Sequence, residues 1–283
     1  MTAISAFGSD KSFKTSINST EDPATFLLLG EYDPWLTTSS KEASKFHRAQ
    51  STKLISAITS NWANLSEITV AFNGVFEKDI TNLKAFYGKK VKFKRVTKAE
   101  VKNYSNINTL REINSPALGE IIGFTLLWSD NTLADRLARN SADELGFTRD
   151  SDGMNLAFQK TLKELEVDST GLSVADGSGL SHDNRVSAKL LGDLLVKIYK
   201  DPRFAGVIES LPDGGVNGTL NERFIKTAPN AVGLVHAKTG TLNGTVTLAG
   251  YIESGDHEYV FVVLADRLSR TYSAAKIARD TLD

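Results

Sequence analysis

The stretch Gly233-Leu234-Val235-His236-Ala237-Lys238-Thr239-Gly240-Thr241-Leu242 runs from apolar to polar residues and is typical of a buried strand. Within it, Lys238 supplies a positive charge, Thr239 supplies a hydroxyl donor, and Gly240 lets a substrate backbone lie close. These three residue types in a row on a strand can bind a carboxylate. Lys-Thr-Gly alone is a short match, however, and a strand that ends in a turn explains it without a site. The rest of the chain has to decide between the two interpretations.

The composition predicts a folded protein with a substantial core. The chain has 283 residues, of which 41% are hydrophobic and 24% charged, enough for one large domain or two ordinary ones. Its formal net charge is −1, so the chain as a whole is not expected to bind nucleic acid or an anionic membrane. The basic run 89–95 alternates lysine with apolar residues, and we interpret it as a strand with a solvated face.

Several kinds of chemistry are excluded or disfavoured by residue usage. The absence of cysteine excludes disulfides, thiolate catalysis and cysteine-ligated metals. The four histidines show no ligand spacing, so neither a metal site nor a cofactor is predicted. No apolar run approaches the roughly 18 residues of a membrane-spanning helix. The first eight residues lack the basic segment and apolar core of a signal peptide.

The first part of the chain is predicted to form a small α/β domain. Its expected elements are a helix that closes at Gly8, a buried strand over 24–30, a turn at Asp33-Pro34, a helix capped by Ser39 or Ser40 that runs to about Trp62, and strands over 67–76 and 91–96. We assign residues 1–19 to the end of one helix and the start of an insertion. Residues 20–103 are the inserted domain, and the polar segment 103–108 is its expected linker.

Residues 104–283 are predicted to contain helices followed by an antiparallel sheet. The expected helices are 115–128, with Pro116 at its first position, a second one that begins at Ser129-Asp130-Asn131, then 152–167, 187–199 and 271–282. The expected strands are 233–241, 245–253 and 259–266, the last two joined by a hairpin turn at Gly255-Asp256. The whole chain is therefore expected to be an α/β (α+β) protein.

Ser129-Asp130-Asn131 lies between two expected apolar helices. Helix capping is the simpler explanation, because all three residue types are preferred N-caps. Ser-x-Asn in a helical region, followed by Lys-Thr-Gly on a strand, is nevertheless the combination used by serine acyl-transfer enzymes of the penicillin-recognising group. Ser16-Ile17-Asn18 and Tyr104-Ser105-Asn106 are partial matches, but neither lies between apolar helices.

A third segment points to one family. The glycine-rich turn Asp176–Ser187, the segment Gly214–Leu220 and the strand at Lys238 together resemble the low-molecular-mass, class C penicillin-binding proteins of the D-alanyl-D-alanine carboxypeptidase/endopeptidase family (peptidase family S13 type). Leu29–Pro34 is similar to a diverged form of that family's Gly-Gly-Asp-Pro turn. The resemblance implies a serine β-lactamase/transpeptidase-like domain with an antiparallel sheet and a helical region, plus an inserted α/β domain. Ser178 lacks the Gly-x-Ser-x-Gly spacing of a nucleophile elbow and is not a candidate.

The resemblance implies catalytic roles for three residues. Ser129 would return a proton to the leaving D-alanine, and Asn131 would hold the substrate amide and the catalytic lysine. Lys238 would stabilise negative charge in the site.

It also implies a substrate-binding strand. Thr239 would bind the terminal carboxylate, and Gly240 would let the substrate lie close. The backbone N–H of Thr241 would form half of the oxyanion hole.

The nucleophile that this mechanism needs is missing from its expected place. The attacking serine belongs to a Ser-x-x-Lys at the start of a helix, but no lysine ahead of Ser129 has a serine three residues before it. Thr38-Ser39-Ser40-Lys41 follows the Asp33-Pro34 turn, which is the wrong position. Residues 1–8 look like the later part of the nucleophile helix. We therefore expect an N-terminally truncated chain in which Met1 is internal, and no hydrolysis or acylation by penicillin.

Three functions remain open from the sequence. The first is a serine-type D-Ala-D-Ala carboxypeptidase or endopeptidase that acts on peptidoglycan through an acyl-enzyme. The second is a catalytically dead muropeptide-binding module of the same fold, and the third is a β-lactamase or esterase on that scaffold. The expected partners are peptidoglycan stem peptides and β-lactams, and the expected location is extracytoplasmic, in the periplasm or cell wall. The sequence makes no prediction of oligomeric state.

Overall fold

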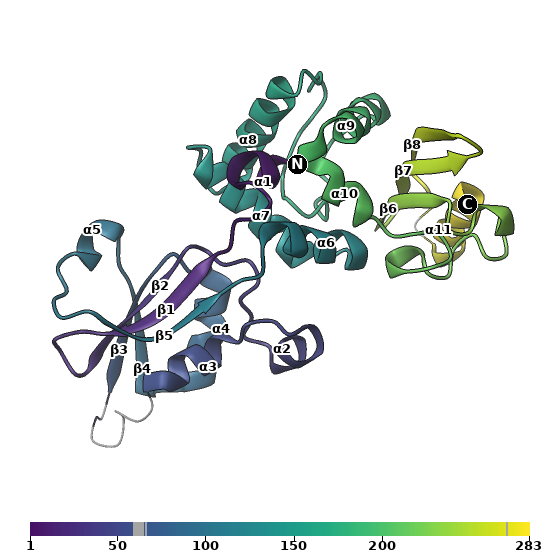
Figure 1. Ribbon diagram of the computed structural model, residues 1–283. Helices are drawn as coiled ribbons and strands as arrows, with labels where there is room; N and C mark the ends of the chain where they lie inside the picture. Colours follow the sequence, from purple (N-terminus) through teal and green to yellow (C-terminus); the bar gives the residue numbers. More distant parts are fainter. Residues whose placement is uncertain (59–64, 66, 270) are drawn as a thin grey trace. The chain divides into compact units, whose positions relative to one another are not determined.

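The computed structural model describes residues 1–58, 65, 67–269 and 271–283 (Figure 1). The chain forms two compact units. The small unit is Lys11–Ala117, and the large unit combines Met1–Asp10 with Leu118–Asp283.

The small unit is built on a mixed sheet with strand order β4-β3-β2-β1-β5. Strands β2, β3 and β4 run parallel, whereas β1 is antiparallel to both β2 and β5. Its elements are β1 Lys14–Ser19, β2 Thr25–Gly30, α2 Ser40–Phe46, α3 Ser51–Ile55, β3 Ile68–Asn73, α4 Glu77–Tyr87, η2 Gly88–Lys90, β4 Val91–Arg95, α5 Lys98–Val101 and β5 Asn108–Asn114.

A single apolar cluster holds α3 and α4 against one face of this sheet. Leu54 and Ile55 of α3 and Ile80 of α4 are fully buried among strand residues such as Ile17 and Phe72. Burial of that many large aliphatic side chains is the main source of stability for the unit. The predicted strands over 24–30, 67–76 and 91–96 are confirmed as β2, β3 and β4.

The small unit extends beyond the predicted range of 20–103 because β1 and β5 belong to its sheet. Neither strand shows an alternating apolar pattern, and polar side chains fill the interior of β1. The Asn18 amide donates to Ser16 Oγ at 3.0 Å and to the Leu27 carbonyl at 3.1 Å, and Thr109 of β5 donates to Asn18 Oδ1 at 2.8 Å. The partial motif Ser16-Ile17-Asn18 is thus part of a sheet interior.

The predicted helix from residue 39 to about 62 is wrong. The chain forms α2 and α3 instead, with a left-handed residue, His47 at φ +53°, at the end of α2. The cause is Arg48, whose buried guanidinium donates to the Trp35 carbonyl at 3.0 Å and to Glu42 Oε2 at 3.1 Å. Ser39 does cap α2, as predicted, by accepting the backbone N–H of Glu42 at 3.2 Å. The last residues of the predicted helix, 59–62, lie outside the described residues.

The large unit contains the predicted antiparallel sheet, with strand order β6-β7-β8, and a set of helices. Its elements are α1 Thr2–Phe7, α6 Leu118–Trp128, α7 Asn131–Glu144, α8 Ser151–Glu164, α9 Ala188–Lys200, η3 Pro202–Phe204, α10 Ala205–Glu209, η4 Gly218–Leu220, η5 Pro229–Ala231, β6 Val235–Leu242, β7 Thr245–Ser254, β8 His257–Ala265 and α11 Tyr272–Leu282. The predicted helices and strands of this region are therefore present, and Gly255-Asp256 joins β7 to β8.

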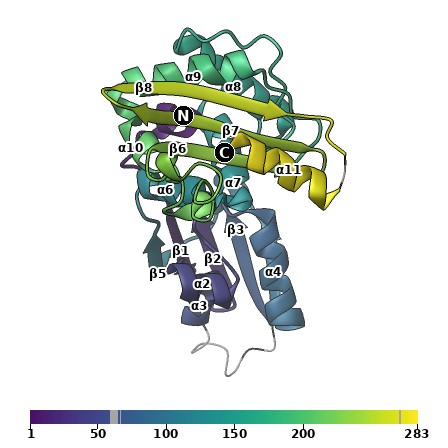
Figure 2. The same ribbon diagram turned by 90° about the vertical axis from the view of Figure 1, so that its right-hand side faces the viewer.

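Helices cover both faces of the three-stranded sheet, with α11 on one face and α9 on the other (Figure 2). On the α11 face, Val235 and Ala237 of β6 and Leu248 of β7 share a buried cluster with Leu282. On the α9 face, the buried Tyr251 of β7 donates its hydroxyl to the Leu195 carbonyl at 2.8 Å.

Helix α6 begins at Leu118, so Pro116 is not its first residue. Ser115 belongs to the small unit, where its buried hydroxyl accepts the backbone N–H of Phe13 at 2.9 Å. That bond links the segments around Phe13 and Ser115, so the Ser115 hydroxyl is used there and does not cap α6. None of the helices in the described part of the chain combines the length and apolar character needed to cross a bilayer.

Candidate active site

Ser129 joins α6 to α7 with a left-handed backbone, at φ +56°. The N–H of Asp130 donates to the Thr125 carbonyl at 3.2 Å, the long bond of a Schellman motif, which places Ser129 where helices commonly carry glycine. Asp130 then caps α7, since its carboxylate accepts the N–H of Leu133 at 2.9 Å. Capping therefore accounts for Asp130, whereas a serine at this position carries strain of about 1–2 kcal/mol.

Lys238 of β6 reaches Ser129 from the sheet. Its ammonium donates to Ser129 Oγ at 2.8 Å and to the Thr239 carbonyl at 2.7 Å. An ammonium has three N–H donors, so one remains for a ligand. Burial lowers the pKa of Lys238 from 10.5 to about 8. At neutral pH the side chain is still mostly protonated, and its charge attracts an anion more strongly in this partly desolvated place than it would in bulk water.

Thr239 has a hydroxyl partner that the sequence did not single out. Its Oγ1 lies 3.0 Å from Oγ1 of Thr219, and the two form a hydrogen bond. Thr219 belongs to the segment Gly214–Leu220, which contributed to the family resemblance without any residue being assigned a role. The only local feature that could have pointed to Thr219 is its position directly after Gly218. The spacing of the residues does not show that the chain returns to β6 here.

The segment that carries Thr219, here called the 212–220 loop, pairs with the first half of β6. The N–H of Ala237 donates to the Pro212 carbonyl at 3.0 Å, and the N–H of Gly214 donates to the Val235 carbonyl at 2.8 Å. Asp213 and His236 form an isolated antiparallel bridge. The loop is therefore fixed to the strand by backbone hydrogen bonds of the kind that hold a sheet together.

His236 adds a side-chain link between the 212–220 loop and the sheet. Its Nδ1 lies 2.6 Å from Asp213 Oδ1, and its Nε2 lies 3.2 Å from Glu253 Oε1 of β7. Burial alone would lower the pKa of His236, but the hydrogen bonds to the two carboxylates outweigh it and raise the pKa. The imidazole therefore links two carboxylates from different segments.

The remaining predicted site residues are Gly240, Thr241 and Asn131. Gly240 is opposite Thr247 of β7, where a Cβ would lie 2.3 Å from Thr247 Oγ1, so packing within the sheet also requires glycine. Thr241 is exposed two residues beyond Thr239 on the same strand. Asn131 is exposed as the first residue of α7. The structure thus brings the Lys238 ammonium to the Ser129 hydroxyl and the Thr239 carbonyl, and it pairs the Thr239 hydroxyl with Thr219. The side chains of Asn131 and Thr241 face solvent.

The turn that begins at Asp176 is organised around that one carboxylate. Asp176 Oδ1 accepts the backbone N–H groups of Ser178 at 2.8 Å and Gly179 at 2.6 Å, and Oδ2 accepts that of Ser181 at 2.6 Å. Burial raises the pKa of Asp176, but these bonds and the Ser178 hydroxyl outweigh it and lower the pKa. The Ser178 hydroxyl donates to Asp176 at 2.8 Å, so this serine stabilises the turn.

One Ser-x-x-Lys occurs in the chain after Ser129. Ser273-Ala274-Ala275-Lys276 lies near the start of α11. Helix α11 packs on the face of β6 that carries Ala237, whereas the Lys238 side chain reaches Ser129 at the junction of α6 and α7. The Lys276 ammonium pairs with Asp280 at 2.5 Å. This match is therefore not part of the Lys238 site.

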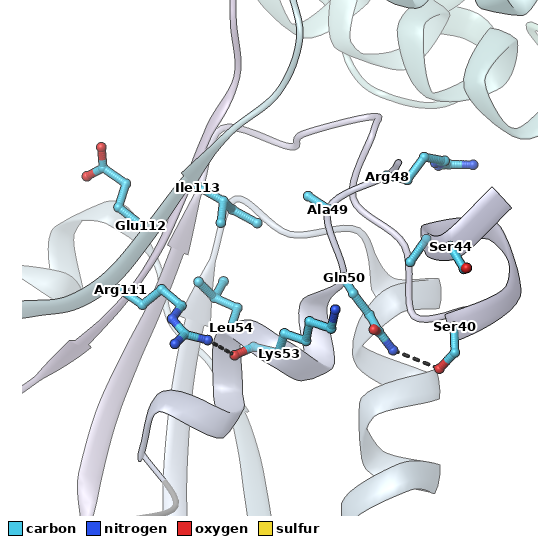
Figure 3. Close-up of a pocket in the computed structure, with 11 residues that line it drawn as sticks. Ser40, Ser44, Arg48, Ala49, Gln50, Lys53, Leu54, Arg111, Glu112 and Ile113 are labelled. Carbon is cyan, nitrogen blue, oxygen red and sulfur yellow. Dashed lines mark hydrogen bonds between the residues drawn. The ribbon is translucent and has the colours of Figure 1, made fainter. Parts of the chain in front are cut away.

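The small unit contains a separate cavity of about 700 Å³ (Figure 3). Lys53 lies along it, Gln50 donates to Ser40 Oγ at 2.9 Å, and Arg111 donates to the Lys53 carbonyl at 2.7 Å. None of the predicted site residues lines this cavity. Among the described residues, no group of three or more His, Cys, Asp or Glu side chains could hold a metal ion.

Comparison with known families and curated proteins finds similarity to carboxypeptidases. A model of the D-Ala-D-Ala carboxypeptidase 3 (S13) family matches residues 73–283. Carboxypeptidase DacB of Mycolicibacterium smegmatis is 34% identical over 148 residues, which are 51% of this chain and 32% of that protein. A D-alanyl-D-alanine carboxypeptidase of Actinomadura sp. is 33% identical over 167 residues, 57% of this chain and 31% of that protein. The matched part of the chain spans about a third of the length of these relatives.

Solved structures share the fold. Penicillin binding protein 4 of Haemophilus influenzae, solved with a β-lactam, aligns with a TM-score of 0.72 at 18% identity over 99% of this chain and 86% of that one. A predatory endopeptidase of Bdellovibrio bacteriovorus, solved with an immunity protein, aligns with a TM-score of 0.70 at 20% identity over 99% and 81%. Identities this low establish the fold alone. The expected α+β transpeptidase-like fold is confirmed.

Proposed function

Because the chain belongs to the D-Ala-D-Ala carboxypeptidase 3 (S13) family, we propose that it carries the substrate-binding side of a serine-type D-Ala-D-Ala carboxypeptidase/endopeptidase site. The substrate would be a peptidoglycan stem peptide, cleaved through an acyl-enzyme. The observation that carries this proposal is the hydrogen bond from the Lys238 ammonium to Ser129 Oγ, at 2.8 Å. It joins the two motifs whose combination is typical of this chemistry.

The carboxylate of the terminal D-alanine would bind beside Lys238. One ammonium N–H remains after the bonds to Ser129 and to the Thr239 carbonyl, and the Thr239 hydroxyl is a second donor. Donors of this kind form charge-assisted hydrogen bonds with a carboxylate, which are stronger than neutral ones. The ligand class that fits is therefore a peptide with a free carboxyl terminus.

Ser129 would pass a proton to the leaving group. When a serine oxygen bonds to the penultimate carbonyl carbon, the C–N bond breaks and the departing D-alanine nitrogen needs the proton that the serine released. The Lys238 ammonium donates to one lone pair of Ser129 Oγ. The O–H of Ser129 can then donate to the departing nitrogen, while the second lone pair of Oγ accepts the incoming proton. Lys238 remains protonated throughout and orients Ser129.

A non-catalytic binding module is the second candidate function. Ahead of Ser129 no lysine has a serine three residues before it, and Ser273 lies near the start of α11, which packs against Ala237 of β6. In the part of the chain that the structure describes, no Ser-x-x-Lys pair accompanies Lys238. Such a chain would hold a stem peptide without being acylated.

The proposed partners follow from the same site. They are peptidoglycan stem peptides and β-lactams, whose carboxylates Lys238 and Thr239 would hold. The substrate lies outside the cytoplasmic membrane, so we propose an extracytoplasmic location, in the periplasm or cell wall.

Binding calorimetry with N-acetyl-D-Ala-D-Ala tests the proposal. We expect the chain to bind this peptide more tightly than the L-Ala-L-Ala isomer. Lys238→Met should weaken binding by at least about tenfold, because a hydrogen bond to a charged group is worth about 1.5–3 kcal/mol. The matched control is Lys276→Met, which removes an exposed lysine and should change nothing. Equal binding of the two isomers, or no effect of Lys238→Met, would contradict the proposed site.

Fluorescent penicillin separates the enzyme from the binding module. The binding module predicts reversible competition by penicillin and no covalent label on this chain. A stable label mapped to a serine beside Lys238 would instead establish an acylating enzyme. Rapid β-lactam hydrolysis without a lasting label would favour a β-lactamase or esterase.

A further inference from the structure

Thr219 and Thr239 form a pair of hydroxyls from two separate segments. Their Oγ1 atoms lie 3.0 Å apart, and both side chains are only partly buried. A threonine hydroxyl has one proton to donate and two lone pairs. When the Thr239 proton turns toward a bound carboxylate, Thr239 Oγ1 can accept the proton of Thr219. The pair can therefore change its hydrogen-bond direction without losing the bond between the two hydroxyls.

The position of Thr219 is fixed by the turn before it. Gly218 has φ +53°, and a Cβ there would lie 2.6 Å from the Leu127 carbonyl oxygen. Only glycine fits this backbone so close to α6. The α6 residue that it approaches, Leu127, lies two residues before Ser129. Thr219 is thus held between the end of α6 and β6, the two elements that supply Ser129 and Lys238.

The other end of the turn is held by a reciprocal pair of side-chain bonds. Asn217 Oδ1 accepts the N–H of Asp213 at 2.8 Å, and the Asn217 amide donates to Asp213 Oδ2 at 2.7 Å. Asp213 also contacts His236 of β6. Since the turn is fixed at both ends, little conformational entropy is lost when Thr219 orients Thr239.

We propose that Thr219 is a positioning residue for carboxylate recognition at this site. It donates its proton to Thr239 Oγ1 and so directs the single Thr239 proton to the terminal carboxylate of a peptide. The inference rests on the proposed function, because it names how that same site selects a free carboxyl terminus over an uncharged one.

The test compares N-acetyl-D-Ala-D-Ala with its C-terminal amide, using calorimetry on the full chain. Wild type should prefer the acid. Thr219→Val keeps the shape of the side chain but removes the hydroxyl, and should weaken acid binding by at least about fivefold while leaving amide binding unchanged. Thr219→Ser restores the hydroxyl and should recover acid binding to within about threefold of wild type.

Thr245→Val is the matched control. Thr245 lies on β7, and its exposed hydroxyl donates to Asp266 at 2.7 Å, away from the β6 contacts described above. It should leave both affinities unchanged. Equal acid affinities for wild type and Thr219→Val, or an equal loss of acid and amide binding that Thr219→Ser does not rescue, would overturn the proposal.

The same measurements distinguish failure of the inference from failure of the proposed function. If the L-Ala-L-Ala acid binds as well as the D-isomer and both depend on Thr219, the carboxylate inference holds and the D-Ala-D-Ala function is contradicted. If the D-isomer is preferred but Thr219→Val has no effect, only the inference is contradicted. If wild type binds neither acid, both are contradicted.

Discussion

The ammonium nitrogen of Lys238 lies 2.8 Å from the hydroxyl oxygen of Ser129, which precedes it by 109 residues. This contact joins a strand of the sheet to a junction between two helices. It joins two short sequence motifs into one site with a positive charge and a hydroxyl on a strained backbone. The Thr239 hydroxyl, on the next residue of β6, is paired with Thr219. Each of these features leads to a measurable expectation.

Carboxylate binding should depend on the protonation of Lys238. Burial lowers the pKa of Lys238 to about 8, so the charge is present at neutral pH and is lost as pH rises through that value. The affinity for N-acetyl-D-Ala-D-Ala should be constant from pH 6 to 7 and fall above pH 8. Calorimetry across this range is the measurement. An affinity that stays level up to pH 10, where an unburied lysine is still charged, would contradict the assignment.

The left-handed backbone of Ser129 predicts an unusual pair of stability effects. Glycine adopts φ +56° without strain, so Ser129→Gly should be more stable than Ser129→Ala by about 1 kcal/mol. Alanine keeps the strain and loses the bond to Lys238. Urea unfolding of the two variants checks this order, and both should bind the D-Ala-D-Ala peptide more weakly than wild type. Equal stabilities would show that Ser129 is unstrained.

His236 should make stability depend on pH near neutrality. Its bonds to Asp213 and Glu253 raise its pKa above 6.5 against the opposing effect of burial, so the folded state binds a proton more tightly than the unfolded state. That stabilisation is complete below pH 6.5 and is lost as pH rises through the folded-state pKa. The free energy of unfolding should therefore fall from pH 6 to 8. In His236→Gln this fall should be smaller, since glutamine does not titrate.

Asp176 should be essential to its turn. Its carboxylate accepts backbone N–H groups on both oxygens, and an amide nitrogen in place of one oxygen would face donors without an acceptor. Asp176→Asn should destabilise the protein by about 1–3 kcal/mol. The control Asp193→Asn removes only an exposed ion pair with Lys189 and should cost less than about 1 kcal/mol.

Asp176 also predicts an acid effect. Because its pKa is lowered in the folded state, the stabilisation it gives is present above its ordinary pKa of 3.8 and is lost as pH falls through the lower folded-state value. The free energy of unfolding should therefore fall less steeply below pH 3.8 in Asp176→Asn than in Asp193→Asn. Equal acid dependence in the two variants would argue against the role of the turn.

Local pattern was sufficient to predict the part of the site that lies on regular elements. The stretch around Lys238 runs from apolar to polar residues as a buried strand does, and the polar break at Ser129 interrupts two apolar helices. Their contact could not be deduced from spacing, and only the resemblance to a family placed them together. Thr219 was missed because its role depends on where a loop returns along β6, and neither periodicity nor composition encodes that return.

In the small unit, the prediction failed where polar groups replace an apolar pattern. The interior of β1 is held by the hydrogen bonds of Asn18, so the strand lacks the alternation that marks a half-buried strand. The predicted helix beyond Ser39 divides because the Arg48 guanidinium finds buried carbonyl partners. Both are tertiary effects, which local propensity does not contain.

The pairing of the 212–220 loop with β6 has a consequence for hydrogen exchange. The amides of Ala237 and Gly214 are each bonded across the loop and the strand, so they can exchange with solvent only when the two segments separate. These amides should exchange on the slow timescale of the sheet and not on the fast timescale of a surface loop. Separation of the loop from the strand would break this ladder and also release Thr219 from Thr239, so the two threonines should stay within reach of each other for as long as the sheet is intact.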